Sequence, residues 1–274
     1  DTLLVLGARL GEMTSGGYSL FQIPKPTQRL IHIHPNADEL GRVYQADLAI
    51  SCHSSDFLAQ AVRATQGQSA PAPVTERAAY EHWQTPTATP GAVKMEQIIS
   101  HLTQTLPDSA IITNGAGNYA AWLHRYYRYK SYRTQLAPTS GTMGYGLPAA
   151  ISAKLMHPDR DVICLAGDGC FQMNGQEFGT AVQYGANIIV IIANNGVYGT
   201  IRMHQARQYP NRPSGTDMVN PDFAALARAY GAHGETVTQT EQFAAALARA
   251  RAANKPAIID LKTDPAAVSH RTPQ

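Results

Sequence analysis

The sequence has little charge for its length. Asp, Glu, Lys and Arg make up 15% of its 274 residues, whereas an average soluble protein has about 25%. The low charge predicts that other protein covers much of the surface of this chain, and we expect a homodimer or homotetramer. The net charge is +2 and the Lys and Arg residues are scattered, so nucleic acid and acidic membranes are not expected as partners.

Cysteines and long apolar runs are also scarce. The three cysteines, Cys52, Cys164 and Cys170, are odd in number and lack CxxC spacing. This argues against a disulfide framework or a zinc site and favours a reducing compartment, the cytoplasm. The longest strongly apolar stretch, 187–193, is far shorter than the roughly 18 residues that suggest a membrane span. A membrane protein is therefore not expected.

The first part of the sequence alternates short strands with a helix and then changes composition. Strands are expected at 3–6, 30–33 and 48–50, and a helix at 56–64. This pattern predicts that residues 1–66 form part of an α/β domain. Residues 67–91, rich in Gln, Ser, Ala, Thr and Pro, predict a semi-extended linker. Because a strand follows Asp1 almost at once, we expect the chain to be a piece of a longer polypeptide.

A longer strand–helix alternation occupies residues 92–274. Strands are expected near 110–113, 133–136, 161–166, 187–193, 232–237 and 256–261. Helices are expected between them. About six strands joined by helices predict a complete α/β domain, a doubly wound parallel sheet with helices on both faces.

Polar motifs directly follow two of these strands. Gly167-Asp168-Gly169 follows one strand and Asn194-Asn195 the next, and Asp168 and Asn195 are 27 positions apart. That is about one strand–helix–strand unit, so both motifs can face one ligand at the carboxyl edge of the sheet. A carboxylate and an amide oxygen suit Mg²⁺, which takes its other ligands from phosphate and water. The glycines allow backbone amides to approach a phosphate, and the sequence predicts a divalent-metal diphosphate site.

Each motif alone has a plainer interpretation. Gly-Asp-Gly and Asn-Asn-Gly are both common turns. Their joint position, at the ends of two strands one unit apart, favours the ligand site over two unrelated turns.

With Gly141-Thr-Met-Gly-Tyr-Gly-Leu-Pro-Ala-Ala150, these motifs resemble the thiamine diphosphate signature of acetolactate synthases and related 2-oxo acid decarboxylases. The resemblance covers nearly the whole chain. Residues 93–274 are similar to the family's diphosphate-binding domain and residues 1–66 to the second half of its central domain. It implies the thiamine diphosphate-binding fold, with thiamine diphosphate and Mg²⁺ as cofactors.

The resemblance also assigns roles to three metal ligands. In the family pattern Asp168 binds Mg²⁺ through its carboxylate, Asn195 through its side-chain oxygen and Val197 through its main-chain carbonyl.

Further residues match cofactor contacts of the family. Met143 matches the large apolar residue that holds the cofactor bent, although alone it is equally a core residue. Gly141 matches the carbonyl that accepts from the aminopyrimidine amine. The diphosphate contacts implied are Gly167, Gly169, Cys170 and Asn118. Tyr119 stands where acetolactate synthases tend to carry His, so a contact from it is not expected; Cys170 is interpreted as a structural thiol rather than a nucleophile.

The resemblance implies an enzyme that decarboxylates a 2-oxo acid such as pyruvate and ligates the resulting aldehyde unit to a second carbonyl. Alternatives are a simple 2-oxo acid or acyl-CoA decarboxylase, or a non-catalytic assembly or regulatory half. In the family, a Glu of the first domain activates the cofactor; that domain is absent here, so no catalytic residue is expected in this chain and the chain alone should be inactive.

Two further expectations concern FAD and His204. FAD is possible through the central domain but is not favoured, because residues 11–17 depart from the run that follows Gly-Ala-Arg in acetolactate synthases. His204 follows the Asn-Asn motif by nine residues and is a candidate for a substrate contact.

Overall fold

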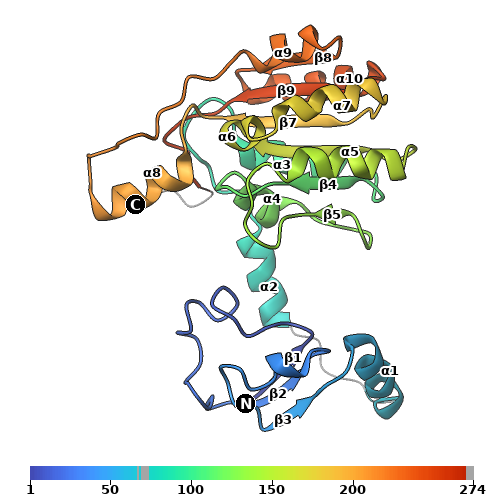
Figure 1. Cartoon of the computed structure of the whole chain (residues 1–274), viewed down its shortest axis with the longest axis vertical. Helices are drawn as coiled ribbons and strands as arrows, with labels where there is room; N and C mark the ends of the chain where they lie inside the picture. Colours follow the sequence, from blue (N-terminus) through green and yellow to red (C-terminus); the bar gives the residue numbers. More distant parts are fainter. Residues whose placement is uncertain (67, 69–73, 270–274) are drawn as a thin grey trace. The chain divides into compact units, whose positions relative to one another are not determined.

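The computed structural model describes residues 1–66, 68 and 74–269 (Figure 1). It divides into two compact units, Asp1–Pro73 and Val74–Gln274. Part of the expected linker, including Pro71-Ala-Pro73, and residues 270–274 of the expected second domain lie outside the described residues.

The first unit contains a small parallel sheet. Its elements are β1 (Thr2–Leu6), β2 (Arg29–Ile33), a short 3₁₀ helix (Ala37–Glu39), β3 (Leu48–Ile50) and α1 (Ser54–Ala64). The strands lie in the order β1-β2-β3, and both neighbouring pairs are parallel. Val5, Leu30 and Tyr44 form its buried cluster. The expected partial α/β domain is present.

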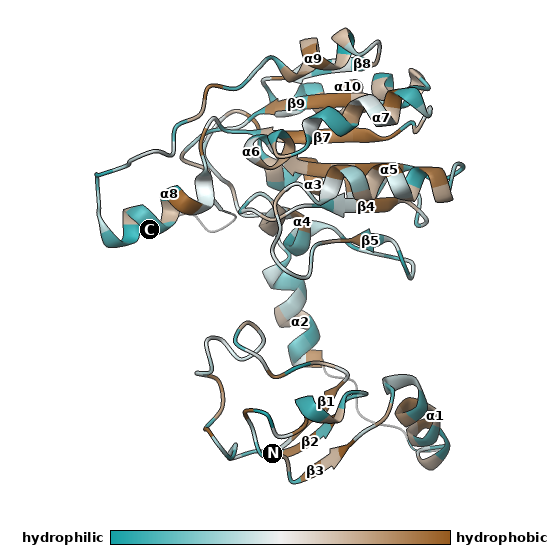
Figure 2. Ribbon diagram, in the orientation of Figure 1, coloured by the Kyte–Doolittle hydropathy of each residue, from teal (hydrophilic) through white to brown (hydrophobic). Residues whose placement is uncertain are grey.

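The second unit is built on six strands. They are β4 (Ile111–Asn114), β5 (Gln135–Leu136), β6 (Val162–Gly167), β7 (Ile189–Asn194), β8 (His233–Val237) and β9 (Ala257–Lys262). The order across the sheet is β5-β4-β6-β7-β9-β8, and every neighbouring pair is parallel. The central strands β6, β7 and β9 are apolar along most of their length (Figure 2), as expected of a parallel sheet that is covered on both faces.

Helices cover both faces of this sheet. The helices are α2 (Val74–Trp83), α3 (Met95–Thr105), α4 (Ala120–Tyr126), α5 (Gly146–Met156), α6 (Asp168–Gln172), α7 (Phe178–Gln183), α8 (Gly199–Gln208), α9 (Phe223–Ala229) and α10 (Phe243–Ala252), with 3₁₀ turns at Gly175–Glu177 and Thr240–Gln242. One buried cluster joins α3, α4 and α10 to the sheet, and the other joins α5, α7 and α9. In β7, Ile191 belongs to the first cluster and Val190 to the second, as the alternation of side chains along a strand requires. The doubly wound fold is confirmed.

The chain changes direction across the sheet between β4 and β6. From β4 it goes to β5 on one side, and it then returns to β6 and β7 on the other. The carboxyl ends of β4 and β6 therefore flank a topological switch point, where open α/β sheets bind ligands.

The expectation of a semi-extended linker over 67–91 is wrong for ten of its residues, because α2 forms at Val74–Trp83. This stretch has no proline between Pro73 and Pro86. An ion pair between Arg77 and Glu81, four residues apart, supports the helix. The end of α2 packs on α4, where Arg125 lies over the Trp83 ring and donates to the Trp83 carbonyl.

No helix within the described ranges is long and apolar enough to cross a membrane.

Candidate functional site

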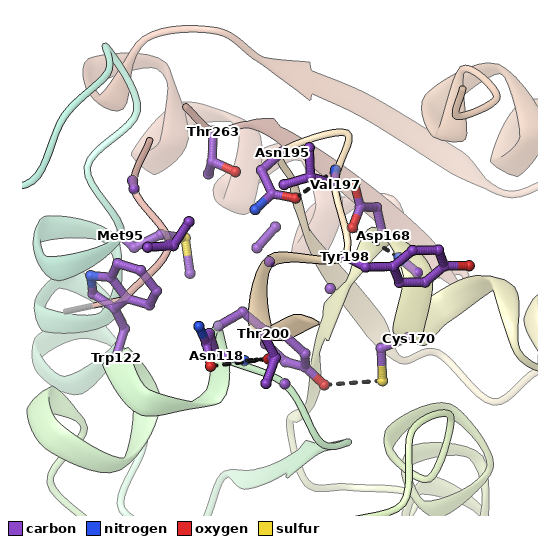
Figure 3. Close-up of a pocket in the computed structure, with 18 of the residues that line it drawn as sticks. Met95, Asn118, Trp122, Asp168, Cys170, Asn195, Val197, Tyr198, Thr200 and Thr263 are labelled. Atoms are coloured by element: carbon purple, nitrogen blue, oxygen red, sulfur yellow. Dashed lines mark hydrogen bonds between the residues drawn. The ribbon is translucent and has the colours of Figure 1, made fainter. Parts of the chain in front are cut away.

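A cavity of about 270 Å³ opens at the carboxyl ends of β4, β6 and β7 (Figure 3). The segments after these three strands supply a large part of its wall, and α8 and the segments after β5 and β9 supply much of the remainder. The following residues singled out from the sequence all line it: Asn118, Gly141, Met143, Gly167, Asp168, Gly169, Cys170, Asn195 and Val197. His204 does not line it and is exposed on α8.

Asp168 is held by three hydrogen-bond donors. Its Oδ1 accepts from the N–H of Gly169 at 2.8 Å, and its Oδ2 accepts from the N–H of Gly196 at 2.8 Å and from Nδ2 of Asn220 at 2.7 Å. Burial raises the pKa of Asp168, and these three hydrogen bonds, together with the nearby N–H of Asn195, oppose that shift. Because a carboxylate oxygen has about two acceptor positions, Oδ2 is filled and Oδ1 keeps one.

Asn195 faces the same part of the cavity as Asp168 (Figure 3). Within the described part of the chain its Oδ1 accepts one hydrogen bond, from the N–H of Val197 at 3.1 Å, so it also keeps an acceptor position. The loop is fixed from outside, because Tyr198 N–H donates to the carbonyl of Thr216. Gly196 has a φ of +67°, which favours glycine at this turn.

These oxygens suit a hard cation. No group of three or more His, Cys, Asp or Glu side chains gathers in the described part of the chain, so a cation here has to use amide or main-chain oxygens as well. One carboxylate oxygen and one amide oxygen with spare acceptor positions form the donor set that Mg²⁺ prefers. The residues present therefore fit a divalent cation.

Asn118, in the loop after β4, lines the cavity and contacts α8. Its N–H donates to Thr200 Oγ1 at 3.1 Å, and that hydroxyl donates to Asn118 Oδ1 at 3.0 Å. The Asn118 Nδ2 lies 3.6 Å from the sulfur of Met203. Asn118 is thus held at the cavity wall, and its contact with a diphosphate stays a prediction.

Cys170 is enclosed by hydrogen-bond donors. The hydroxyl of Tyr119 donates to its sulfur at 3.1 Å, and the N–H of Gly144 lies at the same distance. The Tyr119 oxygen also accepts from the N–H of Gly115 at 3.0 Å. Burial, with Cys170 beside it, raises the pKa of Tyr119 well above its usual range. A buried thiol engaged in this way agrees with the interpretation of Cys170 as structural.

The glycines of the site allow two tyrosine rings to pack against the backbone and allow one turn of positive φ. A Cβ on Gly167 would come within 2.8 Å of the Tyr119 ring, and one on Gly169 within 2.8 Å of the Tyr198 ring. Gly141 has a φ of +68°, a left-handed conformation that glycine adopts without strain. Met143, in the same loop, is half-buried and lines the cavity. Filling the core therefore does not account for Met143, and its role in bending a cofactor stays a prediction.

The sequence did not point to several residues of this site. Met95 and Trp122 form an apolar wall facing Asn195 and Asp168 (Figure 3), yet in sequence they are ordinary apolar positions of helices. Thr200 and Asn220 carried no periodic or motif signal at all.

The fold and the site together define the class: a doubly wound α/β protein with a ligand cavity at the switch point of its sheet. Family models give the particular family. The model described as "Thiamine pyrophosphate enzyme, C-terminal TPP binding domain" matches residues 115–261, and that of the central domain of the same enzymes matches residues 1–61. The chain belongs to the thiamine pyrophosphate enzyme family, which confirms the resemblance. The exact domain limits, 1–66 and 92–274, stay predictions.

Curated relatives and a solved structure are similar over almost all of the chain. The acetolactate synthase large subunit of Parasynechococcus marenigrum is 33% identical over 269 residues, which are 95% of this chain and 43% of that protein. The acetolactate synthase large subunit of Corynebacterium glutamicum is 30% identical, over 95% of this chain and 44% of that protein. The chain thus spans less than half the length of either relative.

The solved structure is the thiamine diphosphate-dependent 4-hydroxybenzoylformate decarboxylase of Rhodococcus jostii RHA1. It superposes with a TM-score of 0.77 and 28% sequence identity, covering 96% of this chain and 49% of that one.

Proposed function

We propose that this chain holds thiamine diphosphate through a divalent cation, Mg²⁺, and serves an enzyme that decarboxylates a 2-oxo acid such as pyruvate and ligates the product to a second carbonyl. One observation carries the proposal: Asp168 Oδ1 and Asn195 Oδ1 line one cavity, and each keeps a spare acceptor position. The acetolactate synthase relatives support the reaction class.

Each part of the cavity has a task in this proposal. Asp168, Asn195 and the Val197 carbonyl would hold the cation. Asn118 and the backbone of Gly167, Gly169 and Cys170 would contact the diphosphate, and Gly141 and Met143 would position the rings. When bound, thiamine diphosphate supplies a nucleophilic carbon and an electron sink for loss of CO₂. Met95 and Trp122, which line the cavity, would exclude water from its apolar side and so strengthen the electrostatic interactions inside it.

The cavity lacks a second carboxylate among the described residues. Asp168 is the one acidic side chain in its lining, and it is engaged by three donors. We therefore propose that the Glu which activates the cofactor comes from another domain, supplied by a partner subunit. General acid–base catalysis is worth about 10² to 10⁴ in rate, so the 274-residue chain assayed alone should show no detectable turnover.

A second candidate is a decarboxylase that does not ligate its product. The Rhodococcus jostii structure favours it, because that protein is a 4-hydroxybenzoylformate decarboxylase with 28% identity to this chain. The apolar wall of Met95 and Trp122 would also suit an aromatic 2-oxo acid. His204, exposed on α8, remains a proposed substrate contact only if α8 moves when substrate binds.

Two experiments test the proposal. Calorimetric titration of thiamine diphosphate should show binding with Mg²⁺ and none in excess EDTA; binding of equal strength in EDTA would refute the cation site. With the complete enzyme, pyruvate, benzoylformate and acyl-CoA substrates should be compared for CO₂ release and products. A ligated product supports a carboligase, a free aldehyde supports a decarboxylase, and cofactor binding without CO₂ from any substrate supports an assembly or regulatory role.

We also propose a homodimer or homotetramer in the cytoplasm. Leu155 and Tyr184 line one hollow of the second unit, Met156 follows Leu155 in the chain, and all three are exposed; exposed apolar side chains that gather in this way mark interaction sites. All three cysteines are free, in keeping with a reducing compartment. Light scattering coupled to size-exclusion chromatography measures the mass; a monomer at micromolar concentration would contradict the oligomer.

A further inference from the structure

A chain of polar side chains runs from β9 to Asp168. Asp260 is fully buried, and its Oδ1 accepts from Nδ2 of Asn194 at 2.9 Å. Lys262 Nζ lies 2.7 Å from Asp260 Oδ2 as a counter-charge, although this pair lacks hydrogen-bond geometry. The Oδ1 of Asn194 accepts from Nδ2 of Asn220 at 2.8 Å, and the same Nδ2 donates to Asp168 Oδ2 at 2.7 Å.

The two carboxylates fix the direction of both amides between them. An ionised carboxylate only accepts hydrogen bonds, so Asn194 has to turn its NH₂ group toward Asp260. The Asn194 oxygen then faces Asn220, so Asn220 has to donate to it from its own NH₂ group. That NH₂ group has two hydrogens, and the second reaches Asp168. Rotating either amide by half a turn would place two acceptors or two donors against each other.

Asn220 is also fixed by its other contacts. Its Oδ1 accepts from Nε2 of Gln172 at 2.8 Å. Two residues before Asn220, the Met218 N–H donates to the Gly196 carbonyl. Two residues after it, the side chain of Asp222 caps α9 by accepting from the N–H of Ala225. The backbone around Asn220 is thus attached both to the loop of Asn195 and to α9.

We propose that Asn220 is a positioning residue for the cation site. With the Gly196 N–H, it fills both acceptor positions of Asp168 Oδ2, so that Asp168 offers a divalent cation Oδ1 alone. Asp260 and Asn194 hold the Asn220 amide in the orientation that makes this possible. The inference rests on the proposed function, since it assumes a divalent cation at Asp168.

The test is a titration of Mn²⁺ into the protein at saturating thiamine diphosphate, followed by calorimetry and by the electron paramagnetic resonance signal of free Mn²⁺. In Asn220→Asp, a carboxylate oxygen replaces the NH₂ group and repels both Asp168 Oδ2 and Asn194 Oδ1. We expect Mn²⁺ affinity to fall about 10- to 100-fold, the range for residues that orient a metal ligand. Asn220→Ala removes the donor without adding charge, and its loss of Mn²⁺ affinity should lie toward the lower end of this range.

The matched control is Asn187→Asp. Asn187 also uses its NH₂ group in hydrogen bonds, to Asn254, but it lies before β7, at the opposite edge of the sheet. This variant should bind Mn²⁺ as the wild type does. Melting temperatures without cofactor are measured in parallel, because a purely structural role would lower them and leave Mn²⁺ affinity intact.

The outcomes separate the two hypotheses. If the wild type does not bind Mn²⁺ with thiamine diphosphate, the proposed function fails. If the wild type binds and Asn220→Ala binds equally well, the positioning role is refuted even when Asn220→Asp does not fold. Loss of affinity in both variants with a normal control supports the role.

Discussion

Replacing Asp168 by Asn should abolish the stabilisation that Mg²⁺ and thiamine diphosphate give, while the fold survives. The carboxylate accepts from three donors, two at Oδ2 and one, the Gly169 N–H, at Oδ1. An amide has a single oxygen, which does best at the Oδ2 position, where it keeps the donors Gly196 and Asn220. Its NH₂ group then points at the Gly169 N–H and at the cation position, and it can bind neither.

The size of each effect follows from this geometry. One buried donor loses its acceptor, which costs about 1–3 kcal/mol. Removing a carboxylate whose pKa is raised by burial acts in the opposite direction, because its desolvation is relieved. The cofactor-free protein should therefore lose at most about 3 kcal/mol. At a ligand concentration of 100 Kd the wild type gains about 2.7 kcal/mol, or roughly 5–11 °C in Tm for a domain of this size.

The assay is a thermal melt of each protein with and without Mg²⁺ and thiamine diphosphate. The wild type should show the full increase in Tm and Asp168→Asn should show none. Asp108→Asn is the matched control, because Asp108 is exposed and forms an ion pair with Lys130; it should keep the full increase. An Asp168→Asn protein that folds and retains the wild-type increase would refute the assignment of the cation site.

Three further predictions concern other residues. Met143→Ala should leave thiamine diphosphate affinity within about threefold of wild type but lower turnover of the complete enzyme by about 10², the cost of misplacing reacting groups by about 1 Å; normal turnover would mean that Met143 only packs. Gly167→Ala should destabilise the protein by about 1–3 kcal/mol in urea denaturation, because its Cβ would meet the Tyr119 ring at 2.8 Å, and an unchanged midpoint would contradict that contact. Burial raises the pKa of Cys164 to about 12, so its thiolate is scarce at pH 8. A thiol reagent should modify the half-buried Cys52 first and Cys164 only on unfolding, and mass spectrometry showing early modification of Cys164 would count against its burial.

The position of the site could be predicted from sequence because two strong local signals coincide. Buried parallel strands are continuous apolar runs, so 161–166 and 187–193 were recognisable, and the motifs after them had to lie at one edge of the sheet. The structure pairs β6 with β7 directly, with Gly167 opposite Ala193. The family models then confirmed the family that the motifs resemble.

Helices without an apolar stripe were not predictable in the same way. The helix α8 contains Gly199, Thr200 and several polar residues and buries none of its side chains, so it has no amphipathic period to detect. The helix α2 was obscured by the prolines around it, although the twelve residues between Pro73 and Pro86 contain no proline and ten of them form the helix.

The network of Asn220 depends on strand order, which the sequence did not give. The strand β9 lies between β7 and β8, although β8 comes first in the chain. This order pairs Asp260 with Ile192 and Lys262 with Asn194, and so brings a carboxylate beside Asn194. Such contacts link residues up to 66 positions apart, and no local pattern records them.

The most direct test of the cation site is an anomalous difference map from crystals grown with Mn²⁺ and thiamine diphosphate. The account predicts one peak about 2–2.3 Å from Asp168 Oδ1 and from Asn195 Oδ1, next to the main-chain carbonyl of Val197. Asp168 Oδ2 should remain bonded to Gly196 and Asn220. A bound cofactor whose Mn²⁺ lies on Asp168 Oδ2, or away from Asn195, would contradict it.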